Sequence, residues 1–347
     1  MANIHNTTIK SVLITSISTL SEAAMAVPVV YPVCEANSHV NFVLVTTAEA
    51  QDIFVNRPAN LIVLDIDPDK YDGITGPIKL ARNLQHRYAF NAVANLHDDF
   101  RTMLMKLVLK RKGVVVATVD QGSKMKNTGN SKSTTPTVHM RYQAVFRQLG
   151  LKTRDDFVSI YGEGDAPRSA MVPVKEQGER WIAIAPFASH KGKQYPLEQM
   201  QLVIAELSRW EHFHIFLLGN GTQERDALDP IMRRYNNVIS VPHIKHSMAD
   251  ELSLLSHCDL MLTMDSAWMH LASLVGLPVV SVWGANHPAC GFLGWHQALR
   301  DTVQLDELDC RPCSRHGNKK CRYGDYHCLR DISPELILDK VKTILQR

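Results

Sequence analysis

Short apolar runs alternate with longer amphipathic stretches through the second half of the chain. The runs are mostly continuous, as is typical of strands buried on both faces of a parallel sheet. The stretch 196–210 between two of them places apolar residues at steps of three and four, which predicts a helix. Strand and helix alternate, which predicts a doubly wound parallel sheet. The strand candidates are "WIAIAPF", "FHIFLLG", "NVISVP", "DLMLTM" and "VVSVWG".

The first half repeats this alternation less regularly. Its strand candidates are "SVLITSI", "NFVLVTT", "LIVLDID", "AFNAVANL" and "GVVVATVD", with helices expected at 21–36, 47–56, 75–87 and 98–111. Residues 162–180 contain turn residues without periodicity and serve as the linker. The chain is therefore predicted to be α/β, with two Rossmann-like domains at 1–165 and 166–347, the second closed by a C-terminal helix.

A polar segment, "QGSKMKNTGNSKSTTPT", covers residues 121–137. Its Gly, Ser, Thr and Lys content predicts a mobile surface loop. The alternative is a flap whose lysines, Lys124 among them, meet an anionic substrate.

Composition excludes several classes of protein. The 347 residues are 45% hydrophobic and 21% charged, with a net charge of +3, which is typical of a folded soluble chain. That mild charge, without an aromatic-basic motif, predicts no nucleic-acid partner. No apolar run reaches the roughly 18 residues of a membrane span, and the N-terminus lacks the pattern of a signal peptide. We therefore expect a cytoplasmic protein.

Candidate ligand-binding residues follow the predicted strands. Asp265 and Ser266 stand where a strand turns into a helix, and a helix start at that edge of a parallel sheet attracts anions. They could equally be N-cap residues of that helix. A second corner carries Ser189 and Lys193, and a third, "LLGNGTQE", offers Gly219 for close backbone approach. No Walker A or G-x-G-x-x-G motif occurs.

Three stretches together carry a family resemblance. In this order, "APFASHKGKQYPLEQM", "DSAWMHLASLVGLPVVSVWGANHP" and "CRPCSRHGNKKCRYGDYHCLRDISPE" resemble the family 9 glycosyltransferases, the ADP-heptose:lipopolysaccharide heptosyltransferases. The likeness extends to "SVLITSISTLSEAAMAVPVV" and "VANLHDDFRT" in the first half. It implies the GT-B fold, in which two Rossmann-like domains face each other across an active-site cleft. It also implies an inverting, metal-independent transfer, with the donor in the C-terminal domain and the acceptor in the N-terminal one.

The resemblance assigns roles to the donor side. Lys193 matches the lysine that meets the donor diphosphate, and Asp265, Ser266 and His270 match the D-[ST]-G-x-x-H segment beside the donor. Ala267 stands where the family commonly has Gly, so the backbone there approaches the phosphate less closely. Ser189 and Gly219 complete the predicted donor set.

The acceptor side departs from the family. The first strand of the family normally runs into S-A-L-G-D, whose Asp is the proposed base, whereas residues 18–22 here are S-T-L-S-E. Glu22 could serve as that base on a longer stem. The alternatives are another carboxylate, such as Asp98, a weakened or inactive enzyme, or a plain first-turn helix acid.

Other residues of the first half are candidate acceptor ligands. His97, Asp98 and Arg101 follow a predicted strand and could orient sugar hydroxyls, although capping of the next helix is the simplest role for Asp98. That helix, "FRTMLMKLVLKRK", is expected to pack on the core with a solvated basic rim. Docking on anionic lipid is its alternative.

Four cysteines crowd near the C-terminus with the spacing C-x2-C-x7-C-x6-C: Cys310, Cys313, Cys321 and Cys328. In a reducing compartment, such a set suggests a structural zinc site, and uncoordinated thiols are the alternative. The cluster is expected to lie outside the strand-end site, and no cofactor is expected for catalysis.

Two functions follow. The first is transfer of a heptose-type sugar from an ADP-heptose-like donor to a lipopolysaccharide core or glycolipid acceptor, with peripheral contact to the cytoplasmic face of the inner membrane. The second is a non-catalytic family member that binds the nucleotide-sugar without turnover.

Overall fold

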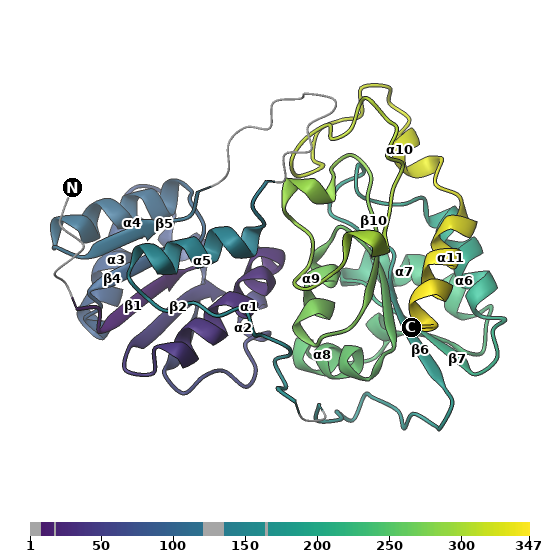
Figure 1. Cartoon of the computed structure of the whole chain (residues 1–347), viewed down its shortest axis with the longest axis horizontal. Coiled ribbons are helices and arrows are strands. Elements are labelled where there is room, and N and C mark those ends of the chain that lie inside the picture. Colours follow the sequence, from purple (N-terminus) through teal and green to yellow (C-terminus); the bar gives the residue numbers. More distant parts are fainter. Residues whose placement is uncertain (1–7, 17–18, 121–134, 164–165) are drawn as a thin grey trace. The chain divides into compact units, whose positions relative to one another are not determined.

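Two compact α/β units make up the computed structural model, which describes residues 8–16, 19–120, 135–163 and 166–347 (Figure 1). Unit 1 contains the described residues before 121 and Pro136–Ile160, and unit 2 contains Tyr161–Arg347. The domain boundary drawn from the sequence, after residue 165, lies close to this division.

Unit 1 is built on a five-stranded sheet in the order β3-β2-β1-β4-β5, with every pair of strands parallel. From β1, the chain adds β2 and β3 on one side and then β4 and β5 on the other. As a result, β1 and β4 are neighbours although they are far apart in the chain. The elements are β1 (Ser11–Thr15), α1 (Leu20–Ala36), β2 (Asn41–Thr47), α2 (Ala48–Gln51), β3 (Leu61–Ile66), α3 (Thr75–Tyr88), β4 (Ala92–Asn95), α4 (Phe100–Arg111), β5 (Val115–Thr118) and α5 (Val138–Gln148).

Unit 2 repeats the plan with a six-stranded parallel sheet in the order β11-β10-β9-β6-β7-β8. Its central strands are buried apart from Arg180, the exposed first residue of β6, as continuous apolar runs predict. The elements are β6 (Arg180–Ala185), α6 (Leu197–Leu207), β7 (Phe213–Leu217), α7 (Gly221–Met232), β8 (Val238–Ser240), α8 (Met248–His257), β9 (Leu260–Met264), α9 (Ala267–Leu274), β10 (Val279–Val282), β11 (Thr302–Val303), α10 (His327–Arg330) and α11 (Pro334–Leu345).

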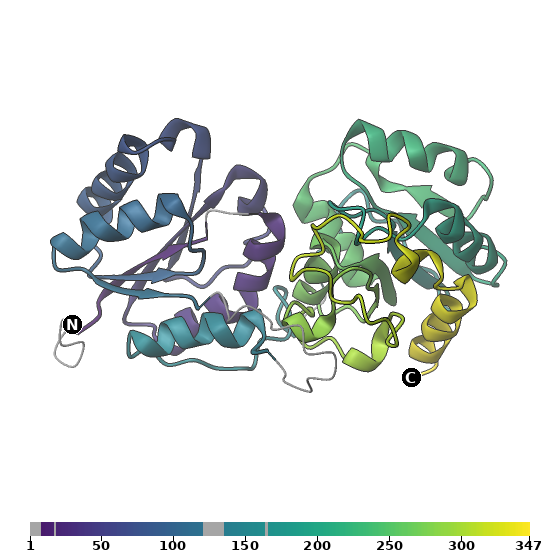
Figure 2. The same ribbon diagram turned by 90° about the horizontal axis from the view of Figure 1, so that it is seen from above.

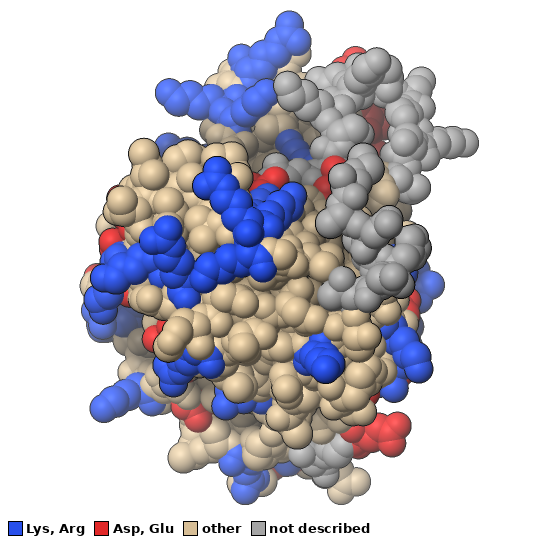
Figure 3. All heavy atoms as spheres, turned by 90° about the vertical axis from the view of Figure 1, so that its left-hand side faces the viewer, with Lys and Arg blue, Asp and Glu red and all other residues tan. Residues whose placement is uncertain are grey.

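Helices cover both faces of the unit 1 sheet. α3 and α4 pack side by side on one face, and α5 packs with α1 on the other. Figure 2 shows α3 and α4, in blue, on one side of the strands and teal α5 on the opposite side. Leu80 and Leu84 of α3 and Met105 and Leu109 of α4 point into the core against the sheet. The opposite faces of α3 and α4 are exposed, and lysine and arginine side chains gather on that side of the molecule (Figure 3).

The prediction of two doubly wound parallel-sheet units is confirmed, with two differences among the helices of unit 1. The helix expected at 47–56 is only the single turn α2, which ends at Gln51. Helix α5 was not expected. Among the described residues, every helix is too short or too polar to cross a membrane.

Candidate functional site

Three neighbouring strands of unit 2 bring Lys193, Asp265 and Asn286 together. Each of them follows one of the strands β6, β9 and β10 at the carboxyl edge of the sheet, Asp265 directly and the other two after short loops. Lys193 Nζ lies 2.8 Å from Asp265 Oδ2, and the Asn286 amide donates a hydrogen bond to the same carboxylate oxygen. Asp265 is 4% exposed and Lys193 is 15% exposed. The corner therefore holds a nearly buried ion pair, and a buried ion pair requires close, hydrogen-bonded geometry.

The start of α9 lies in this corner without a side-chain cap. Ser266 is the N-cap residue, but its hydroxyl lies 3.1 Å from Thr263 Oγ1 and makes no capping hydrogen bond. The Asp265 carboxylate is engaged by Lys193 and Asn286. The alternative that Asp265 and Ser266 only cap α9 is therefore wrong, because neither side chain makes a capping hydrogen bond. Backbone N–H groups of the first turn of α9 are left for another acceptor, and an anion suits them.

His270 lies one turn further along α9, where it is 3% exposed. Burial, with the Lys193 ammonium nearby, lowers the pKa of His270 to about 3. The ring is therefore neutral at physiological pH, with one nitrogen a donor and the other an acceptor. Within the described part of the chain, His270 Nδ1 and Asn286 Oδ1 are buried without a hydrogen-bond partner. Buried polar atoms of this kind need an explanation, and a bound ligand is one.

The other predicted donor residues lie around the same edge. Ala267 is the first residue of α9. Ser189 is exposed in the loop between β6 and Lys193. Gly219 follows β7, the strand beside β6, and a Cβ there would lie 3.1 Å from Glu224 Oε2, which accepts from the Asn220 N–H.

The cysteine-rich loop was expected to lie outside the strand-end site, and this expectation is wrong. The Cys313 N–H donates to the Ala285 carbonyl at 2.7 Å, directly beside Asn286. A Cβ on Gly317 would lie 2.9 Å from the Lys193 side chain. The loop packs against the corner because Gly192 and Gly317 let the backbone approach closely: a Cβ on Gly192 would lie 2.7 Å from the Gly317 carbonyl oxygen.

Arg311 connects the cysteine-rich loop to the segment that follows β10 through hydrogen bonds. Its guanidinium donates to the carbonyls of Trp283, Gly284, Leu305 and Asn286 and to the Gln304 side chain. Burial lowers the pKa of Arg311 from its usual value, but an arginine remains charged. The planar fork thus satisfies several carbonyls at once and fixes the segment that carries Asn286.

The four cysteines of the predicted zinc site are all free thiols. Cys310 Sγ lies 3.6 Å from His327 Nε2, Cys313 donates to the Cys310 carbonyl, and Cys328 is buried in the unit 2 core. Among the residues that the structure describes, no group of three or more His, Cys, Asp or Glu side chains is arranged to hold a metal ion. Zinc at these four cysteines therefore stays a prediction for metal analysis to test.

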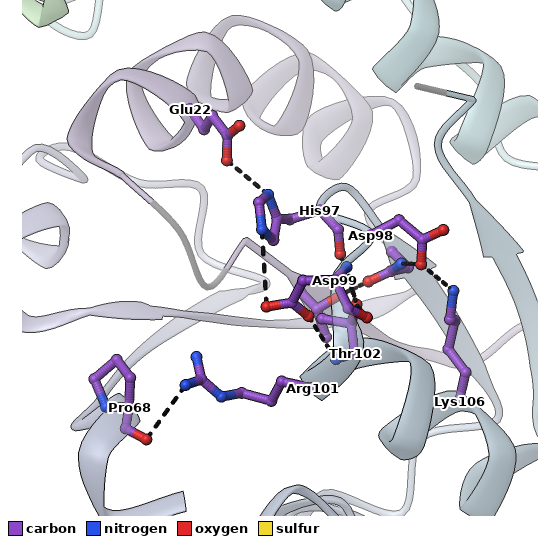
Figure 4. Close-up of polar contacts among 10 residues, drawn as sticks. Glu22, Pro68, His97, Asp98, Asp99, Arg101, Thr102 and Lys106 are labelled. Carbon is purple, nitrogen blue, oxygen red and sulfur yellow. Dashed lines mark hydrogen bonds and ion pairs between the residues drawn. The ribbon is translucent and has the colours of Figure 1, made fainter. Parts of the chain in front are cut away.

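A second polar cluster lies at the carboxyl edge of the unit 1 sheet (Figure 4). Glu22, in the first turn of α1, points to His97, with Oε2 2.8 Å from Nδ1. The other ring nitrogen of His97 lies 3.8 Å from Asp99 Oδ2. The hydrogen bond with Glu22 is the main cause of a raised His97 pKa, and burial opposes it. The cluster forms because β1, which precedes Glu22, is the neighbour of β4, which precedes His97.

Asp98 and Arg101 take other partners. The prediction that Asp98 caps α4 is wrong by one residue. The N-cap of α4 is Asp99, which forms a capping box with Thr102. Asp98 instead pairs with Lys106 and accepts a hydrogen bond from Asn95. Arg101 reaches toward the Pro68 carbonyl, at 3.4 Å, and away from Glu22 (Figure 4). Lys124 lies outside the described residues.

Sequence reasoning missed Asn286 and Arg311 as parts of the donor-side corner. Asn286 follows β10, so the rule that ligands bind at strand ends could have found it. Arg311 carried no such signal, because its partners are backbone carbonyls far away in the sequence.

Comparisons with known proteins agree with the resemblance found in the sequence. Residues 78–326 match the model of glycosyltransferase family 9 (heptosyltransferase). Lipooligosaccharide heptosyltransferase 2 of Campylobacter jejuni is 24% identical over 175 residues, 50% of this chain and 53% of that protein. The protein of the same name from Haemophilus influenzae is 26% identical over 163 residues, 40% of this chain and 44% of its own. The chain thus spans about half the length of the curated relatives it matches.

Solved structures match along the whole chain. A family 9 glycosyltransferase from Veillonella parvula superposes with a TM-score of 0.69 and 19% identity, covering 99% of both chains. The Escherichia coli heptosyltransferase WaaC with ADP gives a TM-score of 0.65 and 12% identity, covering 96% of this chain and 99% of that one. These likenesses confirm the GT-B type of fold. With a family match over more than half of its length, the chain belongs to glycosyltransferase family 9, the heptosyltransferase family.

Proposed function

We propose that the protein transfers a heptose-type sugar from ADP-heptose, or a similar nucleotide-sugar, to a lipopolysaccharide core or related glycolipid acceptor, with inversion at the anomeric carbon. The observation that carries the proposal is the corner of Lys193, Asp265 and Asn286 at the start of α9. It combines a cation with unsatisfied helix N–H groups, which suits the diphosphate of a nucleotide-sugar.

On the donor side, each group has a defined role in this proposal. Lys193 and the N–H groups that begin α9 hold the negative charge that grows on the diphosphate as it leaves. Asp265 and Asn286 position the Lys193 ammonium. The neutral His270 ring offers a hydrogen bond to the donor and no second positive charge.

On the acceptor side, Glu22 is the proposed base. The acceptor hydroxyl oxygen forms a bond to the anomeric carbon while the bond from that carbon to the diphosphate oxygen breaks, and ADP leaves. Glu22 takes the hydroxyl proton. His97 holds the carboxylate in place through the 2.8 Å contact. In this proposal, the contact with His97 fixes the carboxylate of the longer Glu22 side chain. Glu22 could then do the work of the Asp in the family's Gly-Asp pair.

The test is a transfer assay with ADP-heptose and lipopolysaccharide core acceptors. Glu22→Gln is expected to lower turnover by roughly 100- to 10,000-fold, the usual contribution of a positioned base, and to leave ADP affinity unchanged. Glu35→Gln, which alters an exposed glutamate at the other end of α1, is the matched control. Glu22→Asp is a further test. Turnover above that of Glu22→Gln would show that the shorter carboxylate, which the family has, also works in this loop.

Full activity of Glu22→Gln would remove Glu22 from the mechanism. If the parent protein binds ADP but transfers no sugar to any core acceptor, the non-catalytic alternative is favoured instead.

A further inference from the structure

The two neighbouring helices α3 and α4 contain no acidic residue. Their sequences, TGPIKLARNLQHRY and FRTMLMKLVLKR, contain seven lysines and arginines between them and neither Asp nor Glu. The whole chain has a net charge of only +3, with 35 acidic residues. The positive charge of this side of unit 1 is therefore local, and Figure 3 shows lysine and arginine side chains gathered there.

The outward face of α4 is apolar in its first two turns. Phe100 is 58% exposed, Met103 is 49% exposed and Leu107 is 50% exposed. Spacings of three and four residues place these side chains in one stripe along the helix. The opposite face, with Met105 and Leu109, is buried against the sheet. The stripe is thus a second apolar face on a helix whose core contacts are already made.

Basic side chains surround the stripe. Lys110 and Arg111 continue it at the C-terminal end of α4, and Lys79 and Arg82 are exposed on α3 alongside. Within the described residues these four cations form no ion pair, in contrast to Lys106, which pairs with Asp98. We call Lys79, Arg82, Phe100, Met103, Leu107, Lys110 and Arg111 the α3–α4 face.

We propose that the α3–α4 face docks unit 1 on the surface of an anionic lipid bilayer. The proposal rests on the proposed function, whose acceptor is a glycolipid. Aromatic and aliphatic side chains flanked by lysine and arginine are the pattern of helices that lie at a membrane interface. The apolar groups enter the boundary between headgroups and acyl chains, and the cations contact lipid phosphates.

A second copy of the chain fits this face less well. Symmetric pairing would place lysines and arginines opposite one another, and like charges repel. The three apolar side chains are also far fewer than the roughly 20 to 30 residues a side of a stable interface. An anionic surface matches both the charge and the shallow apolar stripe.

The position of the stripe connects docking with the candidate base. Phe100 directly follows Asp99, which caps α4 and lies beside His97. The apolar stripe therefore begins at the edge of the sheet that carries the Glu22–His97 pair. Docking through α4 would bring the bilayer surface, and a sugar chain rising from it, to the same edge.

The experiment is sedimentation of the full-length protein with lipid vesicles that contain neither glycan acceptor nor nucleotide. We expect binding to phosphatidylcholine vesicles that include phosphatidylglycerol and weak binding to phosphatidylcholine alone. Lys79→Glu with Arg82→Glu should lower the partition coefficient at least about tenfold, because each cation near an anionic surface contributes to binding. Phe100→Gln with Leu107→Gln should lower it as well, with less dependence on salt.

Matched controls lie on the other face of the sheet. Arg147→Glu with Lys152→Glu makes the same change in charge, and Met140→Gln with Val158→Gln removes similarly exposed apolar groups. These controls should bind vesicles like the parent. Equal losses in controls and test variants, equal binding to both kinds of vesicle, or a dimer that dissociates on Phe100→Gln with Leu107→Gln would each overturn the proposal.

The proposed function can fail separately. Vesicle binding without sugar transfer would leave docking intact, and transfer without vesicle binding would refute only the docking.

Discussion

Lys193 is the residue on which donor affinity is expected to depend most. Lys193→Gln should weaken ADP binding roughly 10- to 150-fold, the value of a charge-assisted contact of about 1.5 to 3 kcal/mol. Glutamine is preferable to alanine here, because its amide can still donate to the Asp265 carboxylate, which is buried and cannot be left alone. Calorimetry of ADP binding makes the measurement.

The control for Lys193 lies two positions away. Lys191 is an exposed cation of the same loop, and Lys191→Gln should leave ADP affinity within about a factor of two. Equal affinity of the parent and Lys193→Gln would remove Lys193 from the donor site.

His97 makes the stability of unit 1 depend on pH. Its pKa is raised in the folded protein, chiefly by the hydrogen bond with Glu22. The contribution to stability is therefore fully present below the unfolded pKa of about 6.5 and is lost as the pH rises through the raised folded pKa. His97→Gln should lower the melting temperature at pH 6 and change it little at pH 9. A loss of equal size at both pH values would show that His97 contributes by packing and not by charge.

At the scale of elements, the attachment of the cysteine-rich loop to β10 depends on Arg311. Arg311→Lys keeps the charge but loses the planar fork, and it leaves several carbonyls without a donor. We expect a loss of about 3 kcal/mol in the free energy of unfolding of unit 2 and faster cleavage of the loop by protease. Arg322→Lys, at an exposed position of the same loop, is the control. An unchanged melting curve and cleavage rate for Arg311→Lys would contradict this role.

The sequence predicts the strands well because parallel strands buried on both faces leave a continuous apolar run, as in β6 and β9. Short helices are harder to place. The N-cap of α5, Thr137, is also the last residue of the polar segment 121–137. Two of the buried positions of α5, His139 and Gln143, are polar, which weakens the apolar pattern of the helix. Local pattern alone did not separate that helix from the segment before it.

The candidate site was predicted in part, and the limit is physical. Lys193 and Asp265 could be found because each follows a predicted strand, whereas His270 was assigned only through the family resemblance. Asn286 also follows a strand end, but its place beside Asp265 depends on the strand order β10-β9-β6, which a single sequence does not reveal. The same holds for His97 beside Glu22, whose contact requires β1 and β4 to be neighbours.

For the whole molecule, the two units should respond differently to nucleotide. ADP at about 100 times its Kd should stabilise the unit that binds it by about 2.7 kcal/mol. Hydrogen exchange should slow in unit 2, around Lys193 and from Asp265 to Asn286, while the sheet of unit 1 keeps its exchange rates. Protection confined to unit 1 would show that the nucleotide site has been assigned to the wrong unit.

The carboxylate that holds Lys193 also bears on how the site empties. The ammonium lies 2.8 Å from Asp265 Oδ2, so it has an internal partner to which it returns when a nucleoside diphosphate departs. When the nucleotide leaves, the Lys193 ammonium is therefore not left unpaired in a poorly hydrated site. An unpaired ammonium there would cost free energy and would slow release of the product. Release of product limits turnover in many enzymes. In the proposed function, the Lys193–Asp265 pair would therefore lower the affinity for the product and speed its release. Without Asp265, Lys193 would hold the product nucleotide longer and turnover would be slower.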